Sequence, residues 1–277
     1  MILRRADRVE LREIVDPVEV VELLRLRHRI YFEEQEYGPS KCLRLDLTAH
    51  DRRSRLFGVF QGGQLVGGWR IVLRTEQRLE NLFRSLRAVA ELEPEPHSRQ
   101  LPSEEAFDVP LSLGASAELV DAEIGRLTLD TSRVPPWLGF RLIPATLATT
   151  RVAGARLYLY SCATSLAKRY ARVSNPRFML DARARPGIAS DRFVFPKPTV
   201  AAVAAVEDSP YRAVVEHYAR QLVERGSVDL GADGPLRGAA TASVEDAVSG
   251  VVPTLALAEI ASAGRARRSG ATGSEDA

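Results

Sequence analysis

The chain has 277 residues, of which 45% are apolar and 27% are charged, and its formal net charge is +2. This composition is typical of a globular protein and excludes a wholly disordered chain or a collagen-like fibre. The small net charge, without an aromatic and basic face, disfavours the nucleic-acid-binding class.

The sequence shows no targeting segment and no metal-binding motif. The first residues lack the apolar segment of a signal peptide, and no run of about 18 apolar residues could span a bilayer. Two cysteines and four scattered histidines form neither a disulfide framework nor a zinc spacing. We therefore expect a cytoplasmic protein with no integral membrane segment and no metal site.

The first predicted elements are a short strand at 9–15 and the helix that follows it. Asp16 is expected to cap this helix, with Pro17 at its first position and Glu19 completing a capping box. The apolar residues recur at helical spacing, and Arg27 falls on the same face. An arginine on an apolar face needs a specific partner, so this helix is a candidate part of a site.

A β-hairpin is the next predicted element. The apolar segments 55–61 and 64–74 are separated only by Gly62 and Gly63, which favours a two-residue turn. Residues 76–118 then combine an amphipathic stretch with a segment rich in Pro, Glu and Ser. We predict a surface insertion or lid there.

The second half of the chain alternates strands and helices. The pattern predicts, in chain order, a strand at 121–130, a helix at 137–153, a strand at 156–161, a helix at 165–175, and closing strands at 178–182 and 191–196. The expected fold class is α/β (α+β), with a mixed, mostly antiparallel central sheet flanked by helices.

Three regions are expected along the chain. Residues 1–200 form one domain, and residues 201–226 form a C-terminal helix. Residues 227–277 are dominated by Ala, Gly and Ser, and we expect them to be largely disordered because such a composition buries too little apolar surface.

Charged residues occupy positions where the pattern expects core. These are Arg27 on the first helix, Arg70 in the second hairpin strand, and Glu123 with Arg126 in the strand after the insertion. Any one of them could simply face water, as one side of an antiparallel sheet often does. Together they suggest a cleft, in which a bulge at Gly125 would bring Glu123 and Arg126 to one side. A carboxylate near arginines is a candidate general base.

Asp46 and Asp51 precede the hairpin and leave two interpretations open. They could bind a positively charged amine, or they could form turns, for which aspartate is common.

With these residues placed, the chain resembles the GNAT acyltransferase superfamily, in the branch of the acyl-homoserine-lactone (autoinducer) synthases and N-acyl amino acid synthases. The resemblance spans residues 15–195. In that branch an arginine is followed by two aromatic residues, an acidic pair, a hairpin arginine and an E-x-x-R strand, matched here by Arg27, Tyr31, Tyr37, Asp46, Asp51, Arg70, Glu123 and Arg126. Tyrosines replace the usual Phe and Trp, and the aspartates lie farther apart than in autoinducer synthases.

The resemblance implies an N-acyltransferase that moves a long-chain acyl group from a thioester to the amine of an amino acid-like acceptor. Glu123 would accept the amine proton, and backbone N–H groups near Arg126 would stabilise the oxyanion. Arg27 and Arg70 would fix the acceptor carboxylate or order the first helix over the site. Asp46 or Asp51 would hold the acceptor ammonium.

The same resemblance places Tyr31 and Tyr37 among the substrate-binding residues and implies no tightly bound cofactor. The expected co-substrate is an acyl-acyl carrier protein or acyl-CoA. The segment before the helix at 137–153 has only Gly139, which makes a poor pyrophosphate cradle and favours the carrier protein. The apolar residues of that helix either line an acyl tunnel or are plain core.

Two alternatives remain open. The wider aspartate spacing and the insertion favour an N-acyl amino acid synthase over an autoinducer synthase that uses S-adenosylmethionine. A non-catalytic sensor of acyl metabolites on the same fold is the second alternative, because fold does not fix function.

Overall fold

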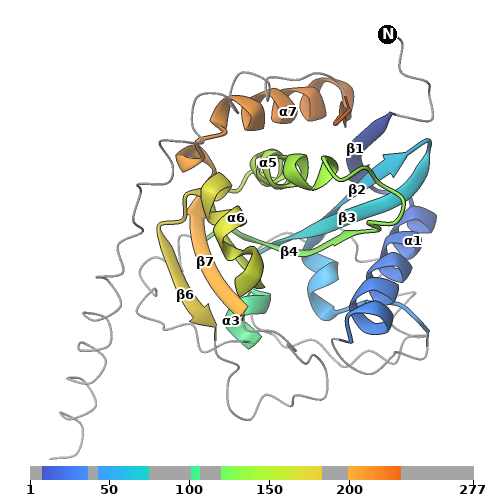
Figure 1. The fold of residues 1–277 in the computed structure, drawn as a ribbon, viewed down its shortest axis with the longest axis horizontal. Helices are drawn as coiled ribbons and strands as arrows, with labels where there is room; N and C mark the ends of the chain where they lie inside the picture. The colour runs from blue at the N-terminus through green and yellow to red at the C-terminus, as the bar shows by residue number, and fades with distance from the viewer. Residues whose placement is uncertain (1–7, 37–42, 75–100, 107–119, 183–198, 232–277) are drawn as a thin grey trace, which may run out of the picture. The chain divides into compact units, whose positions relative to one another are not determined.

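The computed structural model describes residues 8–36, 43–74, 101–106, 120–182 and 199–231. In these ranges eight strands form one sheet, in the order β6-β7-β5-β4-β3-β2-β1-β8. Figure 1 labels β1, β2, β3, β4, β6 and β7. The strands are β1 (Val9–Ile14), β2 (Ser54–Gln61), β3 (Gln64–Leu73), β4 (Ala122–Leu129), β5 (Leu157–Ala163), β6 (Phe178–Ala182), β7 (Thr199–Ala205) and β8 (Ser227–Asp229).

The sheet is mixed and mostly antiparallel, which confirms the predicted fold class. Only β4 and β5 run parallel, and every other neighbouring pair is antiparallel. The α-helices are α1 (Pro17–His28), α3 (Pro102–Ala106), α5 (Leu138–Val152), α6 (Thr164–Ser174) and α7 (Arg212–Arg225). Shorter turns of helix are the π-helix η2 (Arg29–Glu34) and the 3₁₀ helices η3 (Ala49–Arg53) and η5 (Val206–Asp208).

Helices cover both faces of the sheet. A Cβ atom on Gly68 of β3 would lie 2.8 Å from Leu23 Cδ1 of α1, whereas Trp69 donates its indole N–H to Thr149 Oγ1 of α5 at 2.9 Å. Successive residues of a strand point to opposite faces, so α1 and α5 lie on opposite sides of β3. Helix α7 packs against α5 (Figure 1).

The hairpin prediction is confirmed, because β2 and β3 pair on either side of the two-residue turn. Gly62 and Gly63 have φ angles of 58° and 85°. Two successive positive φ angles are the requirement of a type I′ turn, the type whose twist matches that of the paired strands.

The start of α1 is confirmed, but the expected capping box is wrong. Asp16 accepts a hydrogen bond from the backbone N–H of Val18 at 2.7 Å. Glu19 instead pairs with Arg12 of β1, whose Nη1 lies 2.8 Å from Glu19 Oε2. Arg12 of β1 thus pairs with the Glu19 carboxylate, which the capping-box pattern predicts to accept a hydrogen bond from the backbone N–H of Asp16.

The C-terminal part of the fold differs from expectation. Residues 201–205, expected in a helix, belong to β7, and the helix α7 begins at Arg212. Strand β7 is buried along its whole length, so it lacks the alternation that reveals a strand. Residues 227–229, expected in the disordered tail, form β8 and pair with β1, so the folded part extends past the expected boundary.

Several expected segments lie outside the described residues: the strand at 191–196, the tail from residue 232 and most of the insertion at 76–118, of which the structure describes 101–106. None of the helices in the described ranges is long and apolar enough to cross a membrane.

We predict that Gly68→Ala destabilises the fold by about 2 kcal/mol, because the added methyl group overpacks the layer between α1 and the hairpin. Its Cβ would lie 2.5 Å from the carbonyl oxygen of Phe57 and 2.8 Å from Leu23 Cδ1. Urea denaturation followed by tryptophan fluorescence measures the change. Gly139→Ala on α5 is the matched control, since a Cβ there meets nothing within 4 Å. Equal stability of the two variants would contradict the prediction.

Candidate active site

The centre of the candidate site is the buried side chain of Arg27 on α1. Its Nε lies 3.0 Å from Asp46 Oδ2, and its Nη1 lies 2.7 Å from Asp51 Oδ1. The relative exposures of the three side chains are 0%, 0% and 2%. The partner expected for an arginine on an apolar face is thus a pair of aspartates, of which Asp51 lies on η3 and Asp46 precedes it.

Asp51 is held from several directions. Arg70 Nη1 of β3 lies 3.0 Å from Asp51 Oδ2, and the backbone N–H of Thr48 donates to the same oxygen at 2.8 Å. Burial alone would raise the pKa of Asp51, but the charges of Arg27 and Arg70 outweigh burial and hold that pKa well below its usual range. Asp51 therefore stays ionised and pairs with guanidinium groups of the chain itself. It also completes a capping box with Thr48, in agreement with the turn-forming interpretation, whereas binding of an amine stays a prediction.

A bulge in β4 brings Arg126 to the same cluster. The pairing of β3 with β4 shifts register between Gly68 and Arg70, which leaves an extra residue in β4 after Gly125. The sequence predicted a bulge at Gly125, and the extra residue follows directly after it; the residue with positive φ is Arg126, at 57°. A residue other than glycine seldom adopts this conformation unless its surroundings impose it.

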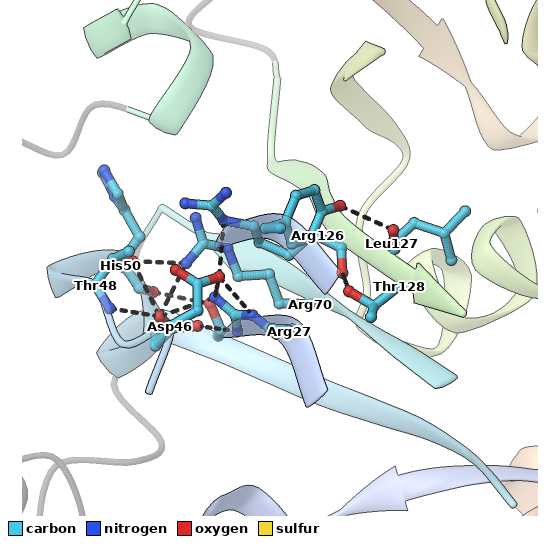
Figure 2. Close-up of polar contacts among 11 residues, drawn as sticks. Arg27, Asp46, Thr48, His50, Arg70, Arg126, Leu127 and Thr128 are labelled. Atoms are coloured by element: carbon cyan, nitrogen blue, oxygen red, sulfur yellow. Dashed lines mark hydrogen bonds and ion pairs between the residues drawn. The ribbon is translucent and has the colours of Figure 1, made fainter. Parts of the chain in front are cut away.

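Contacts with Asp46 and Tyr31 hold Arg126 in place. Its Nε lies 3.2 Å from Asp46 Oδ2 (Figure 2). Its guanidinium carbon lies 5.2 Å from the centre of the Tyr31 ring. The Tyr31 hydroxyl donates to the backbone carbonyl of Leu127 at 2.8 Å. Burial, followed by the positive charges of Arg70 and Arg27, lowers the pKa of Arg126, against the opposing charge of Asp46. Tyr31 therefore contacts both the side chain and the backbone of the bulge.

Strands β4 and β5 separate beside this bulge. Their parallel pairing joins Ala122–Ile124 to Tyr158–Tyr160, and beyond Ile124 β4 pairs with β3 alone. The bulge thus lies where β4 no longer pairs with β5. Such positions re-aim side chains and free backbone groups for other partners.

Glu123 precedes the bulge and is buried, with 2% exposure. Ser103 of α3 donates to both of its oxygens, from the backbone N–H at 2.8 Å and from the hydroxyl at 2.7 Å. Burial raises the pKa of Glu123 to about 7, although these hydrogen bonds and the charge of Arg70 oppose that rise. A carboxyl group that titrates near neutral pH is suited to take up and release a proton.

The structure brings most of the predicted site residues together. One ion-pair network joins Arg27, Asp46, Asp51, Arg70 and Arg126, and Tyr31 packs against Arg126. Figure 2 labels Arg27, Asp46, Arg70 and Arg126 of this network. Glu123 is held by Ser103, and the charge of Arg70 opposes the rise in its pKa that burial causes. Tyr37 lies outside the described residues.

The sequence analysis missed Thr48 and Ser103. The Thr-x-x-Asp spacing of Thr48 and Asp51 is a capping pattern that could have been noticed. Ser103 lies 20 residues from Glu123 in the insertion, and nothing local marks their contact. In the ranges that the structure describes, no group of three or more His, Cys, Asp or Glu side chains could hold a metal ion.

Comparison with known proteins gives matches among solved structures only. No family model matches the sequence, and no curated protein matches it. FeeM, an N-acyl amino acid synthase from uncultured soil microbes, is 17% identical with a TM-score of 0.45, over 74% of this chain and 94% of that chain. The CoA-dependent acyl-homoserine lactone synthase BjaI, solved with SAM and isopentyl-CoA, is 17% identical with a TM-score of 0.46, over 76% and 90%.

Escherichia coli ElaA is 15% identical with a TM-score of 0.42, over 71% of this chain and 99% of that chain. Both classes of synthase named in the sequence resemblance are therefore among the similar structures.

We predict that Arg27→Met lowers the free energy of unfolding by about 4 kcal/mol, because it leaves two buried carboxylates without their shared partner. Chemical denaturation at neutral pH measures the loss. Arg212→Met is the control, since Arg212 pairs with Glu216 at the surface of α7, where such pairs contribute little. An Arg27 variant as stable as this control would show that the buried network does not hold the fold.

Proposed function

We propose that the protein is an N-acyltransferase that moves a long-chain acyl group from a thioester to the amine of an amino acid-like acceptor. The observation that carries the proposal is Glu123, a buried carboxyl group with a pKa of about 7, three positions before Arg126 in the bulge of β4. A general base works best when its pKa lies near the working pH.

In this reaction the acceptor nitrogen attacks the thioester carbonyl, Glu123 takes the proton that the nitrogen loses, and the C–S bond breaks to release a thiolate. The tetrahedral intermediate carries a negative oxygen that needs N–H donors. We assign backbone N–H groups at the bulge to this role, because β4 leaves its pairing with β5 there.

The charge of the cluster suits an acceptor that carries a carboxylate. Three arginines face two aspartates, which leaves one excess positive charge beside Glu123. Each nitrogen of the Arg27 guanidinium already contacts Asp46 or Asp51. We therefore assign Arg27 to holding α1 in place over the site and not to binding the acceptor carboxylate. We assign the acceptor carboxylate to Arg126 and Arg70, and a guanidinium binds that anion with paired hydrogen bonds.

A carrier protein is the proposed source of the acyl group. Helix α6 follows β5 and exposes Lys168, Arg169 and Arg172, with no acidic residue among them. All three side chains are exposed, and their positive charge suits an acidic partner. Acyl-CoA, which carries its acyl group on the same kind of thioester, is the alternative donor.

The test offers the purified protein a long-chain acyl-carrier protein or the matching acyl-CoA, with pooled amino acids in one reaction and S-adenosylmethionine in another, and identifies the products by mass spectrometry. We expect an N-acyl amino acid. An acyl-homoserine lactone would instead identify an autoinducer synthase. Binding of the carrier without either product would favour a sensor.

We predict that Glu123→Gln lowers kcat about 100-fold or more while thioester binding persists, because the amide cannot accept the amine proton. In the parent protein kcat should rise with pH through about 7, as Glu123 loses its proton. Steady-state kinetics across pH measure both effects. An unchanged rate of acyl transfer in the variant would show that Glu123 is not the base.

We predict that Lys168→Glu combined with Arg172→Glu raises KM for the acyl-carrier protein about tenfold or more and leaves kcat with acyl-CoA unchanged, because the change repels an acidic carrier. The effect should weaken as salt is added. Arg220→Glu combined with Arg225→Glu on α7 makes the same change in net charge at another exposed surface. Equal KM values for the two double variants would argue against docking on α6.

A further inference from the structure

The segment 101–106 is fixed against the sheet by contacts of its own. Leu101 is fully buried in a cluster with Val72, Val120, Leu159 and Val203. Glu104 receives two hydrogen bonds from Arg74, including one of 3.0 Å from Nη1, and it also accepts the backbone N–H of Leu101 at 2.9 Å. The position of α3 is therefore set by packing and by an ion pair that do not involve Glu123.

From this fixed segment, Ser103 reaches both oxygens of Glu123. Its backbone N–H donates to Oε2 at 2.8 Å and its hydroxyl donates to Oε1 at 2.7 Å. The Ser103 side chain is itself buried, with 2% exposure. Two donors on one residue, each aimed at a different oxygen, fix both the position and the rotation of the carboxylate plane.

The other groups around Glu123 act in opposite directions. Arg70 of β3 favours the ionised carboxylate, whereas Glu104 of α3 disfavours it. On β5 the residue paired with Glu123 is Leu159, which carries no charge. The donors of Ser103 are thus the nearest groups that stabilise the negative charge against the cost of burial.

We propose that Ser103 is a positioning residue of the acyl-transfer site, which holds the Glu123 carboxylate ionised and correctly oriented. The inference rests on the proposed function, in which Glu123 is the base. It assigns part of the site to the segment between β3 and β4, which the sequence pattern indicated only as a surface insertion or lid.

The direction of the effect follows from the contacts. Ser103→Ala removes the hydroxyl donor and keeps the backbone N–H, so the ionised carboxylate loses one of its two hydrogen bonds. A hydrogen bond to a charged group contributes enough that its loss should raise the midpoint of Glu123 titration by about one pH unit. The fraction of base that is ionised at neutral pH then falls, and the rate falls with it.

The experiment combines two measurements on the full chain. Carbon-13 NMR of protein labelled at glutamate carboxyl groups follows the titration of Glu123, whose signal is identified by its absence in Glu123→Gln. The pH dependence of kcat follows the same proton in acyl transfer. Ser103→Thr keeps the hydroxyl and should restore both profiles towards those of the parent. Ser209→Ala is the control, because Ser209 is also buried and its hydroxyl donates at 2.6 Å to the backbone carbonyl of Val173, a contact that does not involve Glu123.

We expect both midpoints to rise together in Ser103→Ala and to stay at the parent value in Ser209→Ala. An unchanged carboxyl midpoint in a folded Ser103→Ala variant would overturn the inference. A rise in the carboxyl midpoint with no matching change in the rate profile would instead overturn the role of Glu123 as base. The proposed function would then fail, while the effect of Ser103 on the carboxylate would stand.

Discussion

The structure depends on the burial of Arg27 between Asp46 and Asp51. Leaving a buried charge without its partner costs about 3–5 kcal/mol, a large part of the roughly 5–15 kcal/mol by which a domain is stable, so the burial of each of these side chains depends on the other two. The three residues come from α1, from η3 and from the segment between them. Their pairing therefore sets how α1 lies on the hairpin of β2 and β3. The same two aspartates also pair with Arg70 and Arg126.

The bulge in β4 depends on this network in turn. Arg126 has a positive φ angle, a conformation that a side chain other than glycine adopts only when surrounding contacts compensate for the strain. Those contacts come from Asp46, which pairs with the guanidinium, and from Tyr31, which packs on it and binds the next carbonyl. These contacts thereby keep β4 from pairing with β5 beyond Ile124, at the point where acyl transfer is proposed.

Local sequence patterns predicted the elements with strong periodicity or turn chemistry, such as the hairpin at Gly62 and the helix after Asp16. They also marked Arg27 as a charge in need of partners, because an arginine on an apolar face is costly. They could not predict β7, since a fully buried strand of alanine and valine has no alternation. Nor could they predict Ser103 against Glu123, because that contact joins residues that are distant in sequence and is set by the packing of α3.

The same site shifts two carboxyl groups in opposite directions, and the difference separates their roles. Asp51 faces Arg27 and Arg70 directly and stays charged across the ordinary pH range, so it can order the site but cannot exchange a proton with substrate. Glu123 is buried with neutral donors and only a more distant arginine, which leaves its pKa at about 7. Because the arginines pair with the aspartates, their charge offsets only part of the effect of burial on Glu123, and its carboxyl group keeps the basicity that the proposed amide formation would require.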